Sequence, residues 1–145
     1  IFGYHHQLPF SKSSILKEKD ILSHSRKVME EYDVRPQSPH LITSNFSGGN
    51  QQKIILSREL NENPKVLLVG QPTRGVDIGA IEFIHQRLID MRNKGAAILL
   101  VSVELEEVLS LSDRIVVMFD GKIVGERVNK DVTDREIGLL MAGIA

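Results

Sequence analysis

Residues 66–80, VLLVGQPTRGVDIGA, are the stretch that decides the fold: an apolar run, a turn with proline and glycine, and an Asp that can begin a helix. Continuous apolar runs of this length are typical of strands buried on both faces of a parallel sheet. Two further runs follow, ILLV at 98–101 and IVVM at 115–118. Helices are expected between them, over residues 78–93 and 104–110. This alternation predicts an α/β layer with right-handed crossovers.

The segments on either side of this core are predicted from their own patterns. After it, Asp120-Gly121 predicts a type I′ hairpin that adds an antiparallel edge, and a short helix is expected over residues 133–141. Before it, we expect an irregular lead-in, an amphipathic helix, a linker rich in Pro and Ser, and a second helix; these cover residues 1–14, 15–32, 36–43 and 47–61. The composition shifts near Pro64, which divides a helical part, 1–63, from an α/β part, 64–145.

Composition narrows the class of protein. The 145 residues are 41% hydrophobic and 26% charged with a formal net charge of -1, which is ordinary for a globular domain and predicts no general attraction to nucleic acid. There are no cysteines, so disulfides and thiolate chemistry are excluded. The longest apolar run, residues 96–101, is far shorter than the roughly 20 residues of a membrane-spanning helix, so a soluble polypeptide is expected. The chain begins at Ile1 rather than Met, which suggests a piece of a longer protein.

The motif that carries chemistry is NFSGGNQQK, residues 45–53. A Ser and two glycines at the start of a helix form a backbone anion site, because glycine permits close approach and the helix dipole favours negative charge. Phosphate is the natural ligand. On its own, however, Ser-Gly-Gly is more often an ordinary helix N-cap, with Ser47 accepting from free amides of the first turn.

The order FSGGNQQ, VLLVGQPTRGVD, ILLVSVELEEV, LSDRIVVMFDGKIVGE resembles the second half of an ATP-binding-cassette domain, an α/β fold of the P-loop NTPase type. The strings GNQQ and QPTRGVDIGA are similar to the second cassette of the duplicated ATPase subunits of bacterial sugar and nucleoside importers. The resemblance implies a C-terminal fragment: a helical subdomain, 1–63, ending in the signature loop, and part of the α/β core, 64–145, with its parallel-sheet strands, a hairpin and a last helix.

The resemblance also implies roles for individual residues. The signature loop of the family, here Ser47, Gly48, Gly49, Asn50 and Gln51, binds the γ-phosphate of an ATP held by a partner cassette. Asp77 matches the loop that crosses the dimer interface in the family, while an N-cap of the helix that follows explains it equally well.

The same resemblance reveals departures from the family pattern. No Walker A sequence, G-x-x-x-x-G-K-[ST], occurs in the chain, so ATP and Mg²⁺ are expected in the full-length assembly and none tightly bound here. Gly70 stands where the family has an Asp that holds the Mg²⁺ shell, Gln71 replaces the Glu general base, and Val103 replaces the switch His. We therefore expect a degenerate hydrolytic site with no intact catalytic residue and no metal site, and no ATPase activity from the isolated chain.

The expected partners are a second nucleotide-binding domain in the same polypeptide and transmembrane permease subunits, with no nucleic acid. The resemblance places such a protein in the cytoplasm, peripheral on the inner face of the cell membrane. One alternative is a non-catalytic interaction module that packs against a partner cassette and a permease. Another is a DNA-repair ATPase of the same superfamily, against which stand PTRGVD and the lack of coiled-coil heptads. The acidic group Glu104, Glu106 and Glu107 is expected to be a solvated helix start.

Overall fold

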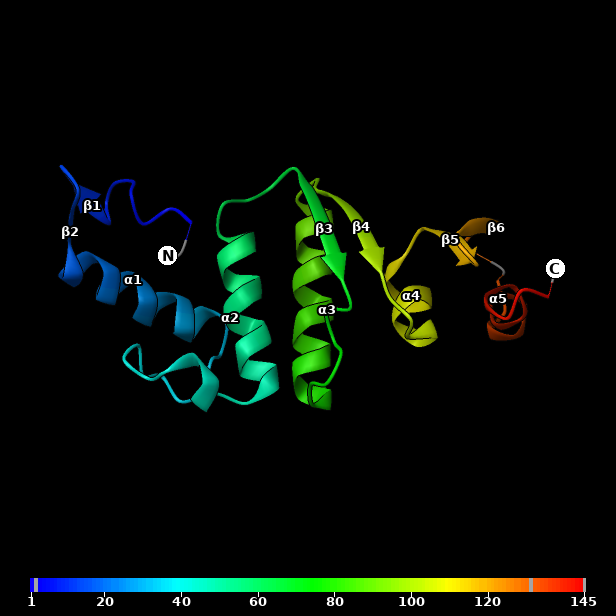
Figure 1. The fold of residues 1–145 in the computed structure, drawn as a ribbon, viewed down its shortest axis with the longest axis horizontal. Coiled ribbons are helices and arrows are strands. Elements are labelled where there is room, and N and C mark those ends of the chain that lie inside the picture. The colour runs from blue at the N-terminus through cyan, green and yellow to red at the C-terminus, as the bar shows by residue number, and fades with distance from the viewer. Residues whose placement is uncertain (2, 131, 145) are drawn as a thin grey trace. The chain divides into compact units, whose positions relative to one another are not determined.

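The computed structural model describes residues 1, 3–130 and 132–144 and has helices and strands in mixed order (Figure 1). In chain order the elements are β1 (Ser11–Lys12), β2 (Ile15–Leu16), α1 (Glu18–Glu31), η1 (Thr43–Asn45), α2 (Gly48–Leu60), β3 (Val66–Gly70), α3 (Ile78–Asn93), β4 (Ala97–Val101), α4 (Leu105–Leu111), β5 (Arg114–Phe119), β6 (Lys122–Val128) and α5 (Asp134–Met141). They form two compact units. We call residues 1–65 with 73–96 the helical unit, and residues 66–72 with 97–145 the sheet unit.

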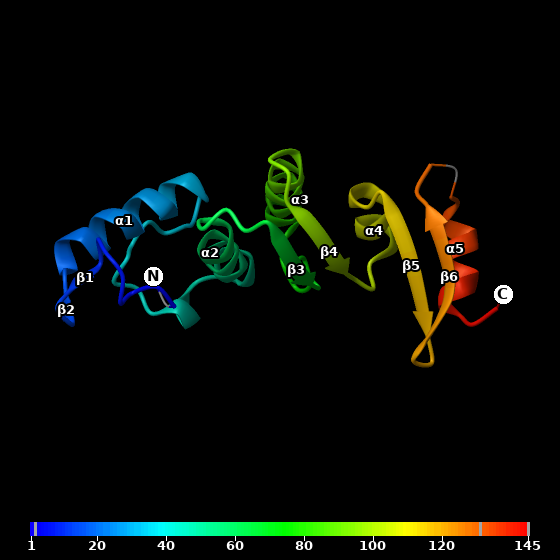
Figure 2. The same cartoon turned by 90° about the horizontal axis from the view of Figure 1, so that it is seen from above.

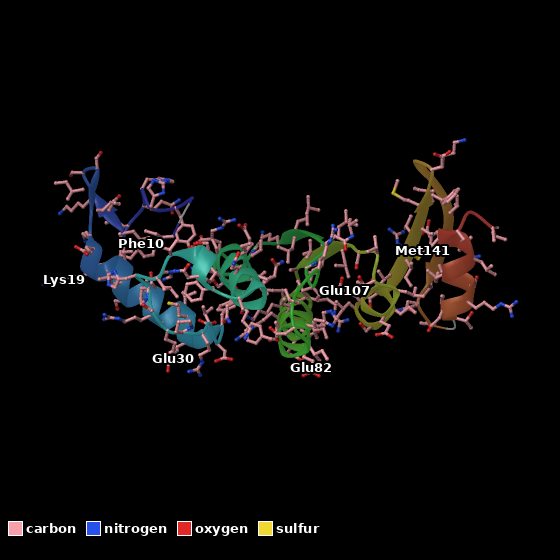
Figure 3. The ribbon with its side chains drawn as sticks, turned by 60° about the horizontal axis from the view of Figure 1, so that its bottom comes forward. Phe10, Lys19, Glu30, Glu82, Glu107 and Met141 are labelled. Atoms are coloured by element: carbon pink, nitrogen blue, oxygen red, sulfur yellow. The ribbon has the colours of Figure 1, made fainter. Side chains whose placement is uncertain are left out.

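The helical unit is built on α1, α2 and α3, and α2 packs against α3. Its core is a cluster of buried side chains from the end of α1, the turn after it and the segment before α2. They are Met29, Tyr32, Val34 and Phe46, with Val28, Leu41, Ile54 and Phe83 packed around them. On the opposite side of α1, charged residues such as Lys19 and Glu30 are exposed (Figure 3). Helix α1 is therefore amphipathic, as its 3.6-residue apolar period predicts.

The first helix begins later than its apolar pattern predicts. Ile15 and Leu16 pair with Lys12 and Ser11 in a short antiparallel ribbon, so α1 starts at Glu18. The turn between the two strands is tight, because Ser13 and Ser14 have φ angles of 53° and 63°. The prediction of an irregular lead-in is wrong for Ser11 and Lys12, where backbone pairing outweighs the lack of a side-chain pattern.

In the sheet unit, β3 and β4 pair in parallel from Val66↔Ala97 to Gly70↔Val101, as the apolar runs predict. β5 and β6 form the predicted hairpin, with Asp120 and Gly121 at φ 45° and 71°, which a type I′ turn requires. Figure 2 shows α5 beside this hairpin. The second core lies here, formed by Ile115, Val117, Ile137 and Leu140.

Three expectations for this unit are wrong. The β3–β4 sheet is not buried on both faces, since Leu68 is 74% exposed and Leu99 59% exposed while Leu67 is buried. Alternate side chains of a strand point to opposite faces, so an uncovered face leaves every second residue in solvent. Within the described residues, β5 pairs with β6 and does not join the β3–β4 sheet. Glu107 of α4 is buried, although Glu104 and Glu106 are exposed as expected (Figure 3).

Candidate anion-binding loop and altered strand ends

Ser47 caps helix α2, as its position before the two glycines predicts. Its backbone is extended, with φ −60° and ψ 158°, and its hydroxyl oxygen accepts from the backbone N–H of Asn50 at 3.4 Å. By helix geometry the amides of the first turn have no partner further back in the helix, and this turn carries no acidic residue. The start of α2 therefore presents donors and a positive dipole end that favour an anion.

Two side-chain amides hold the first turn of α2 to the residues that precede it. Asn50 donates from Nδ2 to Ser47 Oγ at 2.9 Å, and its Oδ1 accepts from the backbone N–H of Arg35 at 2.7 Å. Gln51 donates from Nε2 to the carbonyl oxygen of Phe46 at 2.8 Å. The N-cap and first turn of α2, Ser47 to Gln51, which we call the signature loop, are thus held to Arg35 and to Phe46.

Asp77 caps α3 and lies against the signature loop. Its backbone is extended, and Oδ1 accepts from the N–H of Ala80 at 2.9 Å, so its role as an N-cap is confirmed. A Cβ added at Gly49 would lie 2.7 Å from Asp77 Oδ2 and 2.9 Å from the Cβ of Ala80. Only glycine permits this approach. Both loops belong to the helical unit, which brings the predicted residues Ser47, Gly48, Gly49, Asn50, Gln51 and Asp77 together.

No sequence pattern predicts the charged residues that lie beside this loop. Asp33, Arg35 and Lys53 line a hollow with Gly49, Asn50, Asp77, Gly79 and Ala80. A hydrogen bond from Arg35 Nε to Asp33 Oδ1, with the charge of Lys53 nearby, lowers the pKa of the Asp33 carboxyl. Lys53 is part of the quoted motif, but the turn that contains Asp33 and Arg35 has no local signal that points to α2.

The carboxyl ends of β3 and β4, in the sheet unit, carry Gly70, Gln71 and Val103, the three positions at which we expect a departure from the family pattern. The N–H of Gln71 donates to the carbonyl oxygen of Val101 at 2.8 Å, which joins the two strand ends. Gln71 has φ 51°, in the left-handed region, and Val103 is 63% exposed. A Cβ at Gly70 would meet no atom within 4 Å, so packing leaves room for a carboxylate there. The three side chains bring neither carboxylate nor imidazole to this edge.

No group of three or more His, Asp or Glu side chains in the described part of the chain is placed to hold a metal ion. His24, for instance, stacks edge-on against Phe10 with ring centroids 4.8 Å apart, and burial lowers its pKa. In residues 1, 3–130 and 132–144, no helix combines the length and the apolar character needed to cross a membrane.

No family model matches this chain. It is 50% identical over 135 residues to the nucleoside import ATP-binding protein NupA of Lactococcus lactis subsp. cremoris (strain MG1363), covering 93% of this chain and 27% of that protein. It is 45% identical over 139 residues to the guanosine import ATP-binding protein NupO of Bacillus subtilis (strain 168), covering 96% of this chain and 27% of the relative.

The ADP conformation of MJ1267, an ATP-binding cassette of an ABC transporter, matches with TM-score 0.60 and 26% identity over 90% of this chain and 50% of that one. The chain belongs to the ATP-binding-cassette family. The dimeric cassette MJ0796 has the same fold, with TM-score 0.67 and 20% identity. The match covers 85% of the chain described here and 53% of the MJ0796 chain. The cassette chain spans about a quarter of the length of the curated relatives it matches.

Proposed function

We propose that this chain is part of the ATP-binding subunit of a nucleoside or sugar importer, and that its signature loop contacts an ATP held by a partner cassette. Nucleoside is the favoured cargo, because the nucleoside and guanosine import proteins are 50% and 45% identical to it, whereas a glucose and a ribose import protein are 40% and 37% identical. Residues 1–63 act as the helical subdomain and residues 64–145 as part of the α/β core.

The observation that carries the proposal is the set of hydrogen bonds that the Ser47 hydroxyl accepts. Its oxygen accepts from the backbone and side-chain nitrogens of Asn50, so its own proton is left to donate outward. Ser47 is exposed, as is Gly48 beside it. A hydroxyl donor next to free helix amides fits a phosphate oxygen and needs no Lys or Arg.

The proposal assigns no hydrolysis to this chain's own strand ends. An amide at Gln71 can orient a water but cannot accept its proton, and loss of a general base costs about 10²- to 10⁴-fold in rate. Gly70 has no side-chain oxygen for the Mg²⁺ shell, and the side chain of Val103 cannot hydrogen-bond a phosphate. The chain then assists hydrolysis in trans, with ATP and Mg²⁺ held by the partner cassette.

The partners proposed with this role are a second nucleotide-binding domain in the same polypeptide and transmembrane permease subunits. Such an assembly places the cassette at the cytoplasmic face of the membrane. The altered positions Gly70, Gln71 and Val103 also favour a second candidate, a non-catalytic module that only packs against these partners. The two differ in whether the signature loop touches nucleotide.

Ser47→Arg in the full-length protein, assembled with its permease, tests the proposal. A bulky side chain at the loop blocks the phosphate position, so ATP hydrolysis should fall by about 100-fold or more. Ser44→Arg is the matched control, because Ser44 is also exposed and lies three residues earlier in η1. An unchanged rate for Ser47→Arg would refute contact with ATP and favour the interaction module.

A further inference from the structure

We infer that Asn50 is a positioning residue that sets the direction of the Ser47 hydroxyl proton, and that the main chain of Arg35 sets the orientation of Asn50. The inference rests on the proposed function, since it concerns how the signature loop is prepared for a phosphate. It assigns a task to the Asp33–Arg35 turn, which lies outside the loop.

The chemistry of the donors fixes the direction of each hydrogen bond, that is, which group donates and which accepts. A backbone N–H can only donate, so the group of Asn50 that faces Arg35 N at 2.7 Å is the carbonyl oxygen Oδ1. The amide nitrogen Nδ2 must then face Ser47 Oγ, 2.9 Å away. An amide nitrogen also only donates, so Ser47 has to accept. Its single proton therefore points away from Asn50, toward the exposed side of the loop.

The turn that orients Asn50 is itself held on α2. Lys53, one helical turn after Asn50, donates from Nζ to the carbonyl oxygen of Asp33 at 3.1 Å and lies 3.5 Å from Asp33 Oδ2. Its side chain is only 12% exposed and covers the ring of Phe83 at 4.7 Å. Arg35 Nε donates to Asp33 Oδ1 at 2.8 Å.

Buried residues on both sides anchor the same turn. Tyr32 is 6% exposed and Val34 is fully buried, and both belong to the core cluster of the helical unit. The N–H of Arg35 is therefore a fixed reference, and rotation of the Asn50 amide by half a turn would place an amide nitrogen against it. That arrangement loses the hydrogen bond from Arg35 and sets two donors against each other, although the Ser47 hydroxyl could still donate to the rotated carbonyl oxygen. The conflict at Arg35 therefore favours one orientation of the amide.

A double-mutant cycle in the full-length protein tests this arrangement, with kcat and KM for ATP as readouts. Ser47→Ala should lower kcat by about 10- to 100-fold. Asn50→Leu, which keeps the shape and removes the polar groups, should lower kcat by about 3- to 10-fold with little change in KM. Because Asn50 acts through the hydroxyl, Ser47→Ala/Asn50→Leu should be no slower than Ser47→Ala alone.

Asn50→Asp gives a readout that a purely structural role would not move. The carboxylate that this variant carries at position 50 would accept from both Arg35 and Ser47, so it would turn the Ser47 proton inward. As the pH falls, the carboxyl becomes protonated and can donate to Ser47. The kcat of Asn50→Asp, divided by that of the natural protein, should therefore rise as the pH falls. This recovery should disappear in the Ser47→Ala background, whereas direct repulsion of phosphate by the carboxylate would persist there.

The outcomes separate the two proposals. If Ser47→Ala leaves kcat unchanged, the proposed function fails. If Ser47→Ala lowers kcat while Asn50→Leu does not, only the role of Asn50 is overturned. The same holds if the fold-losses in kcat of the two single variants multiply in the double variant. Should Asn50→Leu unfold, as thermal melting would reveal, the isosteric Asn50→Asp pH series decides, and a flat ratio across pH overturns the inference.

Discussion

Gly49 is a residue at which the signature loop lies directly against the start of α3. We expect Gly49→Ala to lower the free energy of unfolding by about 1–3 kcal/mol, because the added methyl has no space against Asp77 Oδ2 and Ala80 Cβ, at 2.7 and 2.9 Å. Denaturant unfolding measures the difference. Gly138→Ala in α5 is the matched control.

The control glycine is also helical, but a Cβ there would meet nothing within 4 Å. Its replacement by Ala should be neutral or stabilising by up to about 1 kcal/mol, because Ala is the better helix former. Equal effects of the two substitutions would show that helix propensity, and not the contact with Asp77, governs Gly49. The sequence predicts a glycine loop at this place, yet the reason for this glycine lies 28 residues further along.

At the scale of elements, the turn after α1 is tied to α2 through a charged group. The hydrogen bond from Arg35 lowers the pKa of the Asp33 carboxyl, so the ionised form stabilises the fold above the ordinary Asp pKa, and this contribution is lost as pH falls through the lowered value. We expect an NMR titration of the Asp33 carboxyl to give a midpoint below about 3.9.

Two variants make the titration specific. Lys53→Met and Arg35→Gln should each move the Asp33 midpoint upward, because each removes a contact that favours the carboxylate. In the natural protein, an Asp33 titration midpoint at or above the ordinary Asp pKa would contradict the contacts of Asp33 with Arg35 and Lys53. The resonance of the Asn50 side-chain amide reports whether the turn moves with the titration.

At the scale of the whole molecule, the β3–β4 sheet exposes an apolar face. Leu68 and Leu99 are paired in register and are 74% and 59% exposed. Exposed apolar sheet surface with free edges promotes association, so the isolated chain should form oligomers as its concentration rises. Sedimentation velocity measures this.

The charge-neutral variant Leu68→Glu/Leu99→Lys should shift the isolated chain toward monomer. It replaces two apolar contacts by a cross-strand pair of opposite charge and leaves the net charge unchanged. If the natural chain stays monomeric across the concentration range, the exposed face does not drive association.

Much of the local structure follows from short-range patterns. The helix predicted over 78–93 has those bounds, Ser47 and Asp77 begin their helices, and Asp120-Gly121 turns the hairpin. These features depend on residues within one or two turns of one another, so periodicity, caps and turn residues specify them. The ordered motifs likewise predicted the cassette family, which the comparisons confirm.

By itself the sequence determined the order of elements from α2 onward, the starts of α2 and α3, the parallel pair and the family, because each is encoded by residues close in the chain. Only the tertiary structure decided which strand faces are covered, that Glu107 is buried, and that Arg35 meets Asn50 and Asp77 meets Gly49. Those features depend on contacts between distant segments. A hydrogen-bond partner or a covering surface leaves no periodic trace in the sequence around the residue that uses it.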